Sequence, residues 1–133
     1  MDSILTSVKK ILGIEEDYEQ FDADLIIHIN SVFMILEQLG VGKKEPFVIA
    51  DKTATWRDFL GDDAELIAAV PSYVAMKVRL MFDPPSSQAL LASMERIVSE
   101  LEQRVMYIGD REETDATAGN VKESSLQSRN DTL

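Results

Sequence analysis

Apolar residues recur at intervals of three and four along two segments near the start of the chain, a spacing typical of amphipathic helices. The first segment spans residues 4–12, with Ser3 placed to cap its start and Gly13 placed to end it. The second begins at Asp22, a good N-cap residue, and runs to about Leu39. Its apolar stripe is the most regular of the chain and comprises Leu25, Ile26, Ile29, Val32, Phe33, Leu36 and Leu39.

A third helix is predicted from Asp62 or Asp63, either of which can cap it, to about Met81. Pro71 lies inside this segment. Because proline has no backbone N–H and its ring collides with the carbonyl group four residues earlier, either the helix kinks at Pro71 or a new helix begins there. The sequence leaves both possibilities open.

The sequence Asp83-Pro84-Pro85 breaks this helix, and Ser86 or Ser87 is placed to cap a fourth one that continues to about Val105. The composition then changes, since residues 110–133 contain no aromatic residue, no proline and few apolar residues. Such a segment cannot bury enough apolar surface to offset the entropy of ordering it. We therefore expect residues 109–133 to form a flexible, disordered tail in the isolated protein.

No long helix is predicted between residues 41 and 62. Gly42, Pro46 and the β-favouring run Phe47-Val48-Ile49 indicate a loop or a two-stranded excursion, and residues 54–59 fit a one-turn helix. A loop of this length is uncommon inside a small domain and is usually functional when it occurs. This insertion is therefore a candidate for contacts with other proteins.

Together these patterns predict an all-α fold, a small helical bundle of about four main helices with a short irregular or β insertion and a disordered C-terminal tail. With 133 residues, of which 45% are hydrophobic, the chain can build one compact core. We expect a helical domain over residues 1–108, with the insertion at about residues 41–62, followed by the flexible acidic and polar tail at residues 109–133.

Charge and composition narrow the possible functions. The formal net charge of −11, from 24 acidic and 13 basic residues, disfavours binding to a phosphate backbone. The chain has no cysteine and one histidine, which disfavours zinc and haem sites, and no cofactor is predicted. Its start lacks a secretory signal pattern, and no stretch approaches the roughly 20 apolar residues that cross a bilayer. We expect a soluble protein with no membrane or sequence-specific nucleic-acid partner.

No residue pattern of a catalytic site stands out, and we predict that the protein is not an enzyme. His28 is the only histidine of the chain, the residue type used most often for acid-base catalysis, and Asp24 lies four residues before it. No Ser or Cys nucleophile is placed beside it by spacing, so a surface or interface histidine is the favoured interpretation. The acidic pairs lack the spacing of a calcium loop, and residues 40–44 lack that of a phosphate loop.

The residues that could contact other proteins lie in the insertion and in the third helix. Trp56 and Phe59 are interpreted first as closing a small satellite core under the loop, and second as anchors for a neighbouring subunit. Lys77 and Arg79 are either side chains whose charged ends reach solvent from an apolar helix or partners for acidic groups across subunit contacts. The full set of predicted interface residues is Lys43, Lys44, Phe47, Trp56, Arg57, Phe59, Lys77 and Arg79.

Several blocks of the sequence resemble head-tail connector proteins of siphophages, also described as adaptor or head-completion proteins. The similarity covers most of residues 1–107 and consists of sequence blocks and not of chemical motifs. The blocks are Ser7 to Ile14, Asp22 to Phe33, Leu39 to Gly42, Thr53 to Phe59, Tyr73 to Val74, Lys77 to Leu80 and Phe82 to Pro85.

The resemblance implies a structural virion-assembly protein at the head-tail interface, assembled in the host cytoplasm. It implies a homo-oligomeric ring of about twelvefold symmetry between the portal protein and a downstream stopper or tail-completion protein, from subunits that can be monomeric when free. In such families a loop, here Lys43 to Leu60, meets the downstream component, and a C-terminal extension, here Gly109 to Leu133, embraces the portal. The polar tail departs from this pattern because it lacks an amphipathic docking stripe.

An alternative of another class remains open on the residues alone. The same composition suits a soluble helical regulatory protein that binds a single host or phage partner through its acidic tail. Symmetry separates the two interpretations, because a connector adds a ring to the portal and a regulator does not.

Overall fold

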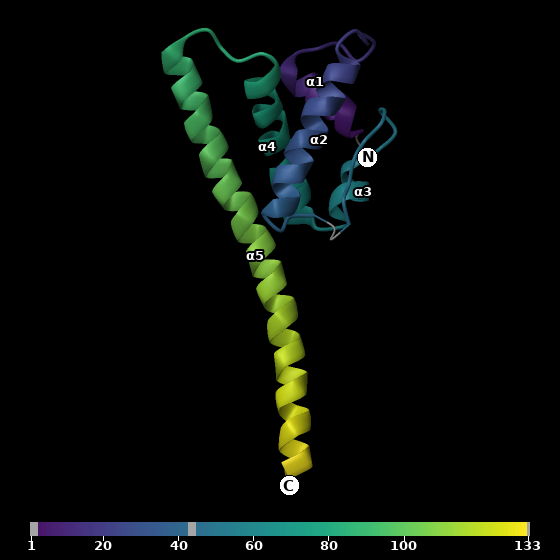
Figure 1. Cartoon of the computed structure of the whole chain (residues 1–133), viewed down its shortest axis with the longest axis vertical. Coiled ribbons are helices and arrows are strands. Elements are labelled where there is room, and N and C mark those ends of the chain that lie inside the picture. The colour runs from purple at the N-terminus through teal and green to yellow at the C-terminus, as the bar shows by residue number, and fades with distance from the viewer. Residues whose placement is uncertain (1–2, 43–44, 133) are drawn as a thin grey trace.

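The computed structural model describes residues 3–42 and 45–132, and the five helices in those ranges confirm the predicted all-α class (Figure 1). Within the described residues the only β-type pairing is an isolated antiparallel bridge between Ser3 and Thr55. The helices are α1 (Ile4–Leu12), α2 (Asp22–Gln38), α3 (Trp56–Leu60), α4 (Ala64–Phe82) and α5 (Gln88–Thr132).

Helix α4 is the centre of the fold, because it packs against α1, α2, α3 and α5. Its side chains Tyr73, Val74 and Val78 are fully buried among them. The chain continues as one helix through Pro71, so no new helix begins there. The loss of one backbone hydrogen bond is tolerated because apolar contacts on both sides of the proline hold the two halves of α4 in the core.

Tyr73 also ties α4 to α5 through a polar contact. Its hydroxyl donates a 2.7 Å hydrogen bond to Glu102 Oε2. Burial raises the pKa of Tyr73 well above its ordinary value, and the neighbouring Glu102 carboxylate raises it further. The phenol therefore stays protonated, and remains a donor to Glu102, throughout the neutral pH range.

Most predicted helix ends are formed by the expected residues. The Oγ atom of Ser3 accepts a hydrogen bond from the Thr6 N–H, and the backbone of Gly13 ends α1 in the left-handed conformation at φ +79°. The Asp63 carboxylate caps α4, and the Ser87 hydroxyl accepts from the Leu90 N–H at the start of α5.

Asp22 is the exception, and its predicted role as the N-cap of α2 is wrong. The cap position is Phe21, which supplies no side-chain hydrogen bond, and Asp22 is the first residue of α2. The carboxylate of Asp22 instead lies 2.9 Å from the ammonium of Lys9. A buried cation attracts a carboxylate more strongly than the backbone N–H groups of a partly exposed helix end do.

The insertion is irregular, as one of the two predicted alternatives proposed, and side chains hold it against the bundle. The Asn30 amide donates to the carbonyl of Ile49 and accepts from its N–H, at 3.0 Å and 2.8 Å. The Ile4 N–H donates to the Ala54 carbonyl. The two bonds from Asn30 satisfy the backbone of Ile49 without a partner strand, and α3 then forms the expected single turn.

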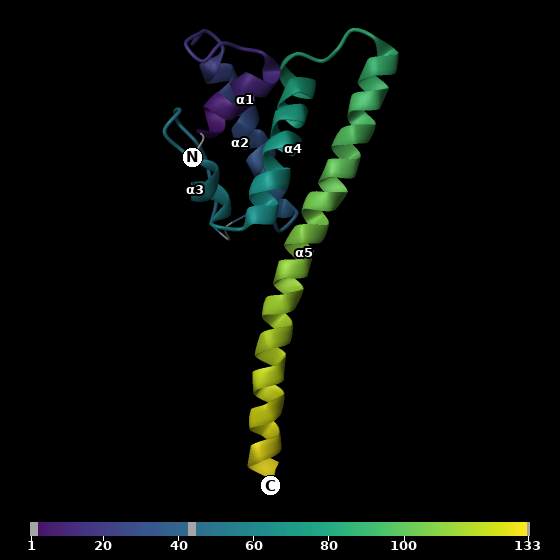
Figure 2. The same ribbon diagram turned by 180° about the vertical axis from the view of Figure 1, so that it is seen from behind.

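Helix α5 differs from the predicted end of the fourth helix, because its backbone remains helical to Thr132. Figures 1 and 2 show its first part beside the bundle and its last part projecting beyond it alone. Gly109 lies within the helix, where a Cβ would meet Val41 Cγ2 at 3.3 Å and the Gly40 oxygen at 3.4 Å. Gly109 therefore permits close packing, and both the expected boundary at residue 109 and the disorder of residues 109–133 in the isolated protein stay predictions.

Gly42 allows a similarly close approach, and replacing it should be costly. Its φ is +94°, and a Cβ built there would lie 2.6 Å from Phe59 Cε1. We expect Gly42→Ala to lower the free energy of unfolding by about 2–3 kcal/mol, from backbone strain plus overpacking. The matched control is Gly40→Ala, where φ is +79° and no atom lies within 4 Å, so only strain of about 1 kcal/mol is expected. Equal losses for the two variants in urea denaturation would contradict the overpacking argument.

Candidate interaction surfaces

The predicted aromatic residues of the insertion form one cluster around Phe33 of α2. Ring centroids lie 5.6 Å from Phe33 to Phe47, 6.4 Å to Trp56 and 4.4 Å to Phe59. The Trp56 indole N–H donates to Ser7 Oγ on α1 at 3.2 Å. Trp56 and Phe59 thus belong to the main core, and the expected separate satellite core is wrong. They can shape the surface of the insertion but expose almost none of their own area.

The predicted basic residues that the structure describes differ from Trp56 and Phe59, because their side chains are exposed or half-buried. Arg57 is exposed on α3, with its Nε 3.8 Å from an Asp62 carboxylate oxygen, a weak surface pair. Lys77 and Arg79 are half-buried on α4, and the Arg79 Nε has no hydrogen-bond partner among the described residues. Lys43 and Lys44 lie outside the described residues.

A buried lysine that the sequence pattern does not single out holds the loop between α1 and α2. Lys9 is 2% exposed, and its ammonium donates to the carbonyl oxygens of Glu16 at 2.9 Å and Tyr18 at 2.6 Å. The same ammonium faces Asp22 Oδ1, which has no other polar partner among the described residues. The Lys9 ammonium therefore contacts three oxygen atoms. Two belong to the nine-residue loop between α1 and α2, and the third belongs to the first residue of α2.

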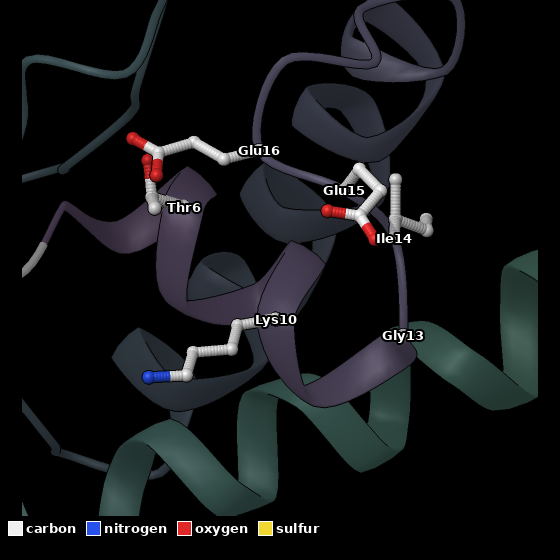
Figure 3. Close-up of a pocket in the computed structure, with 6 residues that line it drawn as sticks. All are labelled: Thr6, Lys10, Gly13, Ile14, Glu15 and Glu16. Atoms are coloured by element: carbon white, nitrogen blue, oxygen red, sulfur yellow. The ribbon is translucent and has the colours of Figure 1, made fainter.

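Two hollows flank this loop. The first has a volume of about 370 Å³ and lies against the end of α1, where Figure 3 shows Lys10 extending away from the carboxylates of Glu15 and Glu16. The second has a volume of about 450 Å³ and is bounded by Ile14, Tyr18 and neighbouring residues. Neither hollow is enclosed, so both are features of the surface and not of the core.

A row of rings extends from the second hollow to the end of α4. Tyr18 and Phe21 lie 5.4 Å apart between centroids, Phe21 and Phe82 lie 5.1 Å apart, and Phe82 and His28 lie 6.3 Å apart. Tyr18 is 41% exposed and Phe21 is 38% exposed. His28 therefore lies half-buried at the end of this row of rings, and its interpretation as a surface or interface residue stays a prediction.

Other exposed apolar side chains lie along the bundle helices. On α2, Ile27 and Met34 are 62% and 60% exposed and, seven residues apart, share one face of the helix. On α5, Leu90 and Ile97 have the same spacing and are also exposed. Such residues are candidates for contacts between subunits.

The described residues also bear on membrane and metal sites. In residues 3–42 and 45–132, no helix is long and apolar enough to pass through a bilayer. The side chains described there also include no group of three or more His, Asp or Glu that could hold a metal ion.

The sequence was compared with known proteins at the level of families, individual proteins and structures. The family model described as "Phage connector protein" matches residues 4–112, which include α1 to α4 and the part of α5 that packs on the bundle. Neither the curated proteins nor the solved structures give a significant match. Because the family model spans most of the chain, this protein belongs to the phage connector family, a family of structural virion proteins.

Proposed function

We propose that this protein is a head-tail connector subunit that forms a ring between the portal and the next head-completion or tail protein. The observation that carries the proposal is the family match over residues 4–112. In this role the protein is a component of the virion and acts by binding neighbours, after synthesis in the host cytoplasm. The twelvefold symmetry implied by the siphophage resemblance is part of the proposal.

The exposed apolar residues supply a surface for contacts between sister subunits. A ring requires a heterologous interface, in which two different faces of the subunit meet. The face of α2 with Ile27 and Met34 and the face of α5 with Leu90 and Ile97 belong to different helices, and both are uncovered in the monomer. We propose that the α2 face of one copy packs against the α5 face of the next.

The residues predicted from the sequence keep their place in this proposal as contacts at the edges of that interface. Arg57, Lys77 and Arg79 can pair with carboxylates of a strongly acidic neighbour. The insertion from Lys43 to Leu60 would meet the downstream protein.

The projecting part of α5 is proposed to contact the portal. It leaves the bundle after the contact at Gly109, so it can reach a neighbour without displacing any helix (Figure 2). If this segment is disordered in free subunits, its ordering cost is met only when the portal is present. Assembly would then depend on the portal.

The test is to mix the purified protein with purified portal and to image the mixture by electron microscopy. We expect a ring of added density on the portal. The double variant Ile27→Asp and Met34→Asp should bind as isolated copies or not at all, because charge on the α2 face opposes subunit packing. The matched control is Ala92→Asp with Ser99→Asp, two exposed positions seven residues apart on the side of α5 opposite Leu90 and Ile97, and it should assemble normally.

Two outcomes would contradict the proposal. A portal that gains no density, together with recovery of a different protein at low stoichiometry, would favour the regulatory alternative. Normal rings from the Ile27 and Met34 double variant would refute the α2 interface while leaving the connector function intact.

A further inference from the structure

We propose that the loop between α1 and α2, together with the end of α4, is a docking surface for a basic segment of another protein in which Lys or Arg residues flank an apolar side chain. The surface, called here the acid-aromatic surface, has an aromatic part and an acidic part. The aromatic part is Tyr18, Phe21 and Phe82, and the acidic part is Glu15, Glu16, Asp17 and Glu19.

The aromatic part can receive an apolar side chain. Tyr18 and Phe21 are exposed beside the hollow of about 450 Å³, which Ile14 also lines. Phe82 supports Phe21 from α4 in an edge-on contact with ring planes 70° apart. Large exposed aromatic groups around a hollow are typical of sites where an anchor side chain is inserted.

The charge of the loop selects the type of partner. All four acidic residues of the acid-aromatic surface are exposed, and residues 13–21 contain no Lys or Arg. Asp22 does not add to this charge because it is paired with Lys9. A segment with Lys or Arg on each side of an apolar residue fits this arrangement, since its cations can face the carboxylates and also the faces of the Tyr18 and Phe21 rings.

The surface is ordered before a partner arrives. Buried Lys9 donates hydrogen bonds to the backbone carbonyls of Glu16 and Tyr18. It therefore fixes the loop while the side chains of both residues remain exposed. Preorganisation of this kind reduces the entropy lost on binding. A loop of four acidic residues without an internal cation would otherwise be extended by its own repulsion.

A second copy of this chain is a poor occupant. Its own segment with basic residues on each side of an apolar one, Lys77-Val78-Arg79, cannot insert an anchor side chain because Val78 is fully buried in α4. The occupant is therefore a different protein with a basic segment. This inference does not depend on ring formation, because it concerns the isolated subunit.

The test uses the full-length protein and a fluorescein-labelled peptide, Lys-Arg-Leu-Arg-Lys, in an anisotropy titration at an ionic strength of about 0.05 M. We expect saturable binding, weakened about tenfold or more by the double variant Glu15→Lys and Asp17→Lys. The matched control is Glu95→Lys with Glu100→Lys, which makes the same change in net charge at exposed positions of α5 and should alter the affinity by less than about twofold.

The aromatic part is tested separately. Tyr18→Ser should weaken binding of the peptide about threefold to tenfold, and replacing the leucine of the peptide with glycine should have a similar effect. Circular dichroism should show unchanged folding, because Glu15, Asp17 and Tyr18 are all exposed. Equal weakening by the loop and α5 charge variants, no binding at all, or self-association that Glu15→Lys abolishes would each overturn the proposal.

Discussion

Replacing Lys9 with Met should lower the free energy of unfolding by about 3–5 kcal/mol, because it leaves a partly buried carboxylate and two backbone carbonyls without their cation. Methionine fills a similar volume, so the loss comes from unpaired oxygens and not from a cavity. The oxygens belong to Glu16, Tyr18 and Asp22. The measurement is urea denaturation followed by the fluorescence of the single tryptophan, Trp56.

The neighbouring lysine supplies the control. Lys10 is exposed on the same helix, and Lys10→Met should change the free energy of unfolding by no more than about 0.5 kcal/mol. The double variant Lys9→Met with Asp22→Asn should recover part of the loss, since the orphaned carboxylate is then neutral. Similar small effects for Lys9→Met and Lys10→Met would show that the buried ion pair does not hold the loop.

Replacing Phe33 with Ala should lower the free energy of unfolding by about 3–5 kcal/mol, the usual cost of removing a buried aromatic ring. Phe33 is the ring that Phe47, Trp56 and Phe59 all contact. Its removal should therefore loosen the insertion as well as the bundle. Hydrogen exchange should become faster at the backbone of Ile49, which is fixed to α2 beside this cluster.

The control for Phe33 is the next residue of the same helix. Met34→Ala removes a side chain that is 60% exposed and should cost no more than about 0.5 kcal/mol. A loss at Phe33 no larger than that at Met34 would mean that the aromatic cluster is not a stabilising part of the core.

The helices could be predicted from the sequence because their signals are local. Apolar spacing and terminal residues such as Ser3, Gly13 and Asp63 act within a few positions of the chain, and the structure has each of them in the expected role. The continuity of α4 through Pro71 could not be read in the same way. It depends on packing against four other helices, and the spacing of apolar residues does not predict which helices pack together.

The acid-aromatic surface was less predictable, because its parts are distant in sequence. Lys9 lies one residue after Val8 and four after Leu5, on the buried face of α1, and this position was the available signal that it is not a solvated lysine. Its partners are two backbone carbonyls of the loop between α1 and α2 and the carboxylate of Asp22, and no local pattern links them to Lys9. Phe82 joins Phe21 only because α4 ends beside the start of α2.

The roles of two glycine residues were also not predictable from the local sequence. Gly13 and Gly109 both follow a helical pattern, yet the first ends a helix and the second lies within one. The difference is a tertiary contact with Gly40 and Val41, which only the fold reveals. The interface residues Lys43, Lys44, Arg57, Lys77 and Arg79 remain predictions, since their partners belong to other chains.

The extent of α5 separates the two ends of the molecule. Its 45 residues extend for about 68 Å at the usual helical rise. The acidic loop lies near the start of this length, and the projecting part points the opposite way (Figures 1 and 2). Two partner proteins bound at these ends would not compete for the same surface. A single subunit could therefore bind both at once and act as a spacer that sets the distance between them.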